Sequence, residues 1–190
     1  MTLNRFCHLT RASAICALLA ITTLVTGGAT TAQSSPRPSI ISNLNHCKIS
    51  QLSVRRVNSD AAMGHIGVSY AFTNISSSPC TLYSYPGFVP LDAKGQPLQG
   101  VKTTWEQRNY LHHAQRHQLT LAPGAQASFE VVYNHISSDG QSCSESAKVE
   151  ITPPNTHDHF SLAEHLSPCR EISVTPPCRG WHYSKLIRST

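Results

Sequence analysis

The sequence predicts an all-β domain over residues 44–176, an immunoglobulin-like β-sandwich of about eight strands held together by disulfide bonds. Three observations support this prediction. Large apolar residues alternate with small or polar ones along short segments, most clearly from Ile66 to Phe72. Turn-forming residues separate these segments, and five cysteines follow residue 44. Because side chains alternate between the two faces of a strand, each segment should bury one face.

The predicted strands follow one another closely, with turns such as Pro123-Gly124 between most of them. They span residues 49–57, 66–73, 81–91, 98–105, 119–121, 129–133, 149–151 and 172–174. One segment has a different pattern: residues 158–166 are expected to form a short helix, since Phe160, Leu162, Ala163 and Leu166 would share its inner face. No segment keeps a helical apolar period beyond two turns.

The first residues predict a secretory signal peptide over residues 1–32. Arg5 and Arg11 form a positively charged start with no acidic residue nearby. The apolar run from 12 to 25 has 14 residues, fewer than the roughly 20 that span a bilayer. Small residues before Gln33 fit a cleavage site. We therefore expect a secreted or periplasmic protein, with an uncleaved membrane anchor as the alternative.

Cleavage after residue 32 leaves 158 of the 190 residues, enough for one domain. Residues 33–43 are rich in Ser and Pro and predict a flexible lead-in, and residues 177–190 predict a C-terminal tail. No second apolar stretch approaches membrane-spanning length, so we expect no transmembrane segment in the mature chain. The basic residues are scattered, with Arg55 and Arg56 as the only adjacent pair. Nucleic-acid binding is not expected, because it needs a dense basic face.

Five cysteines remain in the mature chain and predict disulfide bonds, which are usual in exported proteins. They are Cys47, Cys80, Cys143, Cys169 and Cys178. Two bridges and one unpaired thiol can be drawn in several ways, so counting alone leaves the pairing open. The absence of Cys-x-x-Cys spacing argues against a structural zinc site. We expect Cys178 to be the free thiol, with a bridge to another chain or in place of Cys169 as alternatives.

The order of these features resembles a known family. The matching residues are Cys47 with Leu52 and Val54, Gly64-His65 before the strand from Tyr70 to Asn74, Pro79-Cys80-Thr81-Leu82, Tyr85-Pro86-Gly87, Leu121-Ala122-Pro123-Gly124 with Ala127 and Phe129, and Cys143 before Val149-Glu150-Ile151-Thr152-Pro153. Together they resemble the bacterial domain of unknown function 4232, a family of exported β-sandwich domains. The chain has Ser84 where the family commonly has glycine, and Cys178 and residues 112–117 lie outside the family pattern. The resemblance implies bridges Cys47–Cys80 and Cys143–Cys169, and it brings no catalytic residues.

Histidines form the most unusual group of side chains. They gather in two places, at His112, His113 and His117 and at His157 and His159. On a strand, His113 and His117 would lie about 13 Å apart, which is too far to share one ion. On a helical turn they would lie close enough to bind zinc or copper together. Solvated loop histidines are the simpler interpretation, and periplasmic metal binding by these five residues is the alternative function.

No catalytic motif is found in the sequence. It contains no Gly-x-Ser-x-Gly elbow, no phosphate-binding glycine loop and no His-Glu-x-x-His pair. We therefore expect no enzymatic activity and no cofactor. The expected function is binding or interaction at the cell envelope, with an unknown protein or small-molecule ligand as partner. A small hydrolase whose site is assembled across strands is a third hypothesis.

Overall fold

The computed structural model describes residues 44–107, 114–137, 140 and 142–179 of the chain. All of these residues belong to one compact unit. The predicted signal peptide (1–32), the predicted lead-in (33–43) and residues 180–190 of the predicted tail lie outside the described residues. In the part of the chain that the structure describes, no helix has the length and apolar character needed to cross a bilayer.

The described residues form β-strands and one short 3-10 turn, without an α-helix, so the all-β prediction is confirmed. There are ten strands rather than about eight. The elements are η1 (Ile49–Gln51), β1 (Leu52–Ala62), β2 (His65–Asn74), β3 (Cys80–Leu82), β4 (Gly87–Leu91), β5 (Lys102–Trp105), β6 (Leu119–Leu121), β7 (Gln126–Asn134), β8 (Lys148–Thr152), β9 (Phe160–Ala163) and β10 (Glu171–Val174).

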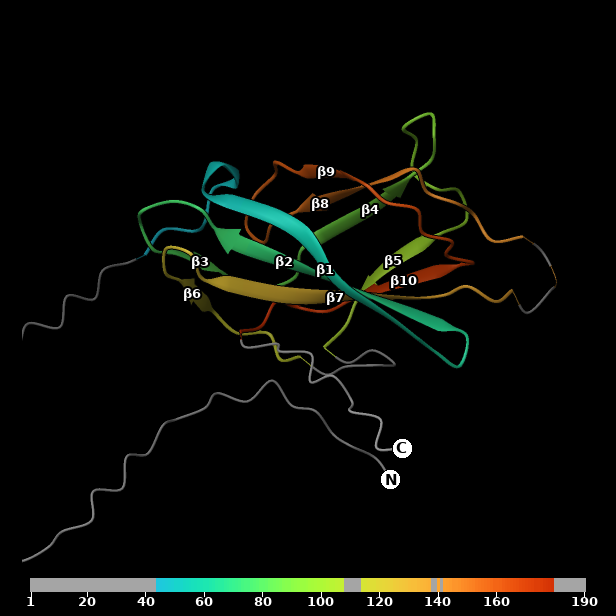
Figure 1. Ribbon diagram of the computed structural model, residues 1–190, viewed down its shortest axis with the longest axis horizontal. Coiled ribbons are helices and arrows are strands. Elements are labelled where there is room, and N and C mark those ends of the chain that lie inside the picture. The colour runs from blue at the N-terminus through green and yellow to red at the C-terminus, as the bar shows by residue number, and fades with distance from the viewer. Residues whose placement is uncertain (1–43, 108–113, 138–139, 141, 180–190) are drawn as a thin grey trace, which may run out of the picture. The chain divides into compact units, whose positions relative to one another are not determined.

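The largest sheet has five strands in the order β1-β2-β7-β10-β5 (Figure 1). Within it, β1–β2, β2–β7 and β7–β10 are antiparallel, whereas β10 and the edge strand β5 are parallel. The other strands form a two-stranded sheet, β3-β6, and a three-stranded sheet, β4-β8-β9. Strands that are distant in the sequence, such as β5 and β10, therefore lie side by side.

The hydrophobic core lies against one face of the five-stranded sheet, which we call the inner face. Tyr70 and Phe72 of β2 and Phe129 of β7 point into it and are at most 1% exposed. The Phe129 ring centroid lies 5.2 Å from that of Phe72 and 5.6 Å from that of Tyr70. Tyr70 also contacts Phe88 of β4, at 5.7 Å between centroids, so the core joins the five-stranded sheet to the three-stranded one. The large apolar residues of β2 and β7 thus alternate as predicted, but positions between them, such as Ala71 and Val132, are buried as well.

The predicted strand over residues 81–91 is two strands, β3 and β4, in different sheets. Ser84 lies between them with a φ of 82°, a left-handed conformation that ends an extended strand. Pro86 has no N–H group to donate to a strand ladder. The Ser84–Pro86 segment therefore lets the chain leave one sheet and enter another, which an apolar pattern alone does not reveal.

The predicted helix over residues 158–166 is wrong, because this segment contains strand β9. Phe160 and Leu162 pack against the core, whereas Ser161 and Ala163, which alternate with them, are exposed. β9 pairs with β8 in antiparallel register. A helix this short gains little stability by itself, and the strand completes the hydrogen bonds along one edge of β8. Leu166 is buried as predicted, but it lies beyond the strand.

Two disulfides join pairs of described cysteines. Cys47 bonds to Cys80 and Cys143 to Cys169, with Cα–Cα distances of 4.8 and 4.2 Å. The first bridge ties the segment before η1 to the start of β3. The second ties the segment between β7 and β8 to the start of β10. Both pairings implied by the family resemblance are therefore present.

Cys178 differs from expectation, because the structure contains it as a disulfide-bonded cysteine rather than a free thiol. A free Cys178 was expected because cleavage after residue 32 would leave five cysteines, and one of the five would have no partner within the chain. Cys178 is 6% exposed, and its N–H donates to the Ser128 carbonyl at 2.9 Å. The Ser128 N–H donates back to Cys178 at 3.0 Å. The described fold thus extends to Cys178, two residues beyond the predicted domain boundary at 176.

Candidate functional site

A pocket lies on the outer face of the five-stranded sheet, which is the face opposite the core. It encloses about 320 Å³. Val132 of β7 and Ser173 of β10 are directly opposite each other in register and line its floor. Their paired neighbours, Tyr133 and Ile172, belong to the core. Because strand side chains alternate between faces, Val132 and Ser173 must point away from the core.

One wall of the pocket comes from the start of β2 and the chain after β7. His65 is opposite Asn134 in the β2–β7 ladder, and both line the pocket. The Asn134 side chain accepts the N–H of Ile136 at 2.7 Å, which turns the chain over this end of the sheet. Gly64 lies beneath that turn with a φ of 83°, and a Cβ there would come within 2.9 Å of the Ile136 side chain. The conformation favours glycine, whereas the exposed Ile136 side chain could move away from a Cβ.

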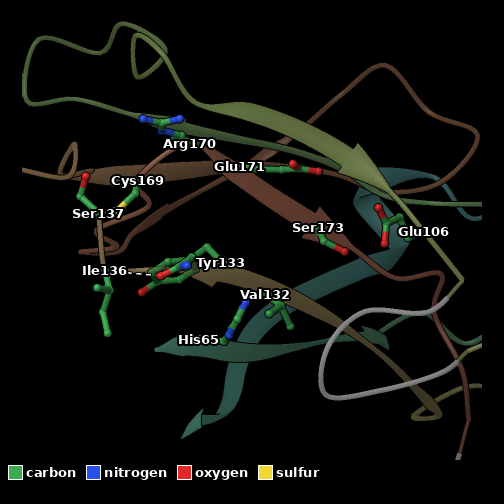
Figure 2. A pocket seen from close by; sticks show the side chains of 11 residues that line it. His65, Glu106, Val132, Tyr133, Ile136, Ser137, Cys169, Arg170, Glu171 and Ser173 are labelled. Atoms are coloured by element: carbon green, nitrogen blue, oxygen red, sulfur yellow. Dashed lines mark hydrogen bonds between the residues drawn. The ribbon is translucent and has the colours of Figure 1, made fainter. Parts of the chain in front are cut away.

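The opposite end of the pocket is a polar row on β5 and β10. Thr104 is opposite Ser173, and its hydroxyl donates to the Glu171 carboxylate at 2.8 Å. Glu106 follows directly after β5, where its N–H donates to the Val174 carbonyl at 3.0 Å. Figure 2 shows the Glu106 and Glu171 carboxylates and the Ser173 hydroxyl toward one end of the pocket. The same view places Arg170, Ser137 and Ile136 toward the other end.

The Cys143–Cys169 bridge is part of the pocket rim. Cys169 lines the pocket, and its N–H donates to the Asn134 carbonyl at 3.0 Å. The Cys143 sulfur lies 3.4 Å from the His135 carbonyl. A covalent bond therefore joins the segment after β7 to the start of β10, so that both walls of the pocket are held in place.

A second group of polar side chains lies at the inner face, around Tyr70. A register shift in β1 between Arg56 and Asn58 marks a β-bulge, and Arg56 precedes it. The Arg56 guanidinium forms an ion pair with Glu164 at 3.1 Å, and the Glu164 side chain is only 8% exposed. Tyr70 is completely buried, and its hydroxyl has no hydrogen-bond partner among the described residues.

The tyrosines of this inner group have raised pKa values. Burial is the main cause of the raised pKa of Tyr70, and the Glu164 carboxylate adds to it, while the Arg56 guanidinium opposes it. Burial also raises the pKa of Tyr133, against a lowering contribution from the Ser167 backbone. Both phenols are thus held in the neutral form, which suits a structural role in the interior.

A comparison with protein families matches residues 47–178 to a family described as a domain of unknown function (DUF4232). The chain belongs to this family. The match runs from the first cysteine of the Cys47–Cys80 bridge to Cys178, and it therefore contains all ten strands and the whole pocket. No curated protein matches the chain.

The histidines predicted to bind metal are only partly described in this DUF4232 domain. His112 and His113 lie outside the described residues. The His117 Nδ1 lies 2.8 Å from the Gln115 carbonyl. His159 pairs with Glu150 of β8 at 3.4 Å, and His157 is exposed. Among the described residues, no three metal-binding side chains gather closely enough to hold an ion. Metal binding at residues 112–117 stays a prediction.

Apart from Cys169, which was predicted as a disulfide cysteine, the pocket residues were not among the predicted site residues of this DUF4232 chain. His65, Glu106, Glu171 and Ser173 come from segments separated by tens of residues, and the sheet register brings them together. Their chemistry provides carboxylates, an imidazole and a hydroxyl around a concave surface. Such a combination can bind a polar ligand through charge and hydrogen bonds.

Proposed function

We propose that this protein is an exported, non-enzymatic domain that binds a ligand at the cell envelope through the pocket on β7 and β10. We also propose that its three sheets form an immunoglobulin-like β-sandwich, in which the core lies between the five-stranded sheet and the other two. The pocket is then on an outer face of the sandwich, where a ligand from the surroundings can reach it.

The observation that carries the proposal is the pocket itself. Its volume of about 320 Å³ is in the range of small-molecule sites. It combines polar groups with the apolar side chains of Val132 and Ile136, as binding pockets commonly do. Its floor is formed by paired strands, and the Cys143–Cys169 disulfide ties together the segments at one end, which favours a preformed arrangement of the binding groups.

Export is supported by a separate set of observations. Disulfide bonds persist mainly in oxidising compartments outside the cytoplasm, and both the Cys47–Cys80 and Cys143–Cys169 bridges are present. The charged start, short apolar run and small residues before Gln33 have the pattern of a secretory signal peptide. These observations favour a secreted or periplasmic protein.

Export can be tested by expressing the full chain in a bacterial host and sequencing the N-terminus of the protein found outside the cytoplasm. A mature chain that begins at Gln33 is the expected result. Recovery of the intact chain from the membrane fraction would contradict export in soluble form and would favour the uncleaved anchor.

The non-enzymatic part needs a different experiment. The purified oxidised protein is incubated with ester, amide, phosphoester and glycoside substrates, and products are followed over many hours. We expect no turnover above the buffer control. Turnover that a single substitution such as His65→Ala abolishes would show that the pocket is a catalytic site, and the proposal would fail.

A further inference from the structure

We propose that the pocket on β7 and β10 binds an organic cation, namely an alkylammonium or guanidinium group on an aliphatic stem. The proposal rests on the binding function proposed above, and it names the class of ligand that the same site takes. The polar row at one end of the pocket holds the cation, and the apolar floor contacts the stem.

The charge of the polar row comes from two carboxylates that flank a pair of hydroxyls. Thr104 and Ser173 are opposite each other in the parallel β5–β10 pair. Glu171 precedes Ser173 by two residues and Glu106 follows Thr104 by two residues, so all four positions share the outer face. The backbone positions of the two glutamates are about 13 Å apart along the strands. A cation placed above the hydroxyl pair can therefore approach either carboxylate.

The Ser173 hydroxyl gives independent support for a ligand that donates hydrogen bonds. Its oxygen is buried and has no hydrogen-bond partner within the described residues. An unpaired buried hydroxyl is unfavourable, and Ser173 also lines the pocket. Ammonium and guanidinium groups carry only donors. A rotation of the Ser173 side chain would bring this buried oxygen to a ligand of this class, which would then supply the missing partner beside the two carboxylates.

Two basic residues lie near the pocket, and Arg170 is the one remote from this end. In Figure 2 the Arg170 side chain is at the far end from Glu106 and Ser173, and Arg170 has an interaction partner of its own. Lys102 is the cross-strand neighbour of Glu171 on the same face, but it does not line the pocket. Glu171 is held by the Thr104 hydroxyl at 2.8 Å, which leaves the second oxygen of its carboxylate for a ligand.

The apolar part of the pocket sets the shape of the ligand. Val132 lies on the floor beside Ser173, and Ile136 stands on the wall at the opposite end. Ile136 is 58% exposed, so contact with an aliphatic stem would remove apolar surface from water. A lysine side chain and a free diamine both provide such a stem with a cationic end.

Calorimetric titration of the purified oxidised protein tests the proposal with four probes. Cadaverine represents a free diamine, and the tripeptide Gly-Lys-Gly represents a basic side chain. Pentanediol and Gly-Glu-Gly are the matched neutral and acidic probes. We expect saturable binding of at least one cationic probe and none of the matched controls. Binding of cadaverine alone would assign the site to free amines, and binding of the tripeptide alone would assign it to basic peptides.

Substitutions then locate the binding. Glu106→Gln and Glu171→Gln together should lower the affinity for the cationic probe by about tenfold or more. Ser173→Ala should lower this affinity by about threefold. Asp158→Asn removes the same charge from an exposed position outside the pocket and should change nothing. Melting temperatures of all variants show whether each one is folded. If the double variant does not fold, Ser173→Ala still tests whether the pocket binds the cationic probe.

Absence of binding by both cationic probes would overturn the proposal. It would also be overturned by binding that Asp158→Asn weakens as much as the pocket variants do. Binding of pentanediol or Gly-Glu-Gly at the pocket, without binding of the cations, would refute the ligand class while leaving the proposed binding function in place.

Discussion

Replacement of Tyr70 by phenylalanine should stabilise the protein. Tyr70 is completely buried, and its hydroxyl has no hydrogen-bond partner among the described residues. A buried polar group without a partner costs about 1–3 kcal/mol. The phenylalanine ring keeps the contacts with Phe88 and Phe129, whose centroids lie 5.7 and 5.6 Å away. Tyr70→Phe should therefore raise the free energy of unfolding by about 1 kcal/mol or more.

Urea unfolding followed by circular dichroism measures this change. The urea midpoint of the variant is compared with that of the unsubstituted protein, provided that the dependence of the free energy on urea concentration is the same in both. Tyr133→Phe is a matched control, because the Tyr133 hydroxyl interacts with the Ser167 backbone. Loss of that interaction should lower the free energy of unfolding by about 0.5–1.5 kcal/mol. The two variants are thus expected to differ in sign. If Tyr70→Phe lowers the stability as much as Tyr133→Phe does, the Tyr70 hydroxyl has a partner in solution and the reasoning is refuted.

Three further predictions concern stability. Because the neutral phenols of Tyr70 and Tyr133 are favoured in the fold, the unfolded chain loses these protons first. The free energy of unfolding should be fully retained below about pH 10 and should fall as the pH rises toward the folded pKa values. The fall should be less steep in Tyr70→Phe. Urea midpoints measured at several alkaline pH values would show both effects. Removing the Cys47–Cys80 bridge, which closes a 33-residue separation, with two alanines should cost about 3.5 kcal/mol. This would lower the melting temperature in calorimetry by roughly 10 °C, and a fall below about 3 °C would contradict the loop-closure argument. Arg56→Ala leaves the buried Glu164 carboxylate without its ion pair and should cost about 1–3 kcal/mol in urea unfolding. The exposed neighbour Arg55 gives the control Arg55→Ala, expected within about 0.5 kcal/mol of the unsubstituted protein.

The strands could be predicted from the sequence where large apolar residues occupy every second position. β2 and β7 alternate strictly between core and outer positions, and their apolar residues meet in the core as predicted. The prediction failed where pairing, rather than local pattern, determines the structure. β9 has the composition of a short helix, but pairing with β8 makes it a strand. The break between β3 and β4 depends on the left-handed conformation of Ser84, which is not a glycine or an asparagine.

The candidate site could not be predicted from the sequence, because its groups meet through sheet register. β5 and β10 are far apart in the chain and parallel, so no hairpin turn signals their contact. Glu106, Glu171 and Ser173 individually look like ordinary exposed residues of strands. The histidine groups were more conspicuous in the sequence, but among the described residues they form no metal-binding cluster. Motif searching favours residues that are close in the chain, whereas this pocket is built across it.

We propose the pocket on β7 and β10 as the binding surface of this DUF4232 domain. The most direct test is two-dimensional NMR of the isotope-labelled, oxidised protein, titrated with a set of small amines, acids, sugars and peptides. We expect that any ligand that binds will shift the backbone resonances of His65, Glu106 and Ser173 more strongly than those of other residues. Shifts that gather on another surface, such as the exposed loop around His157, would contradict it.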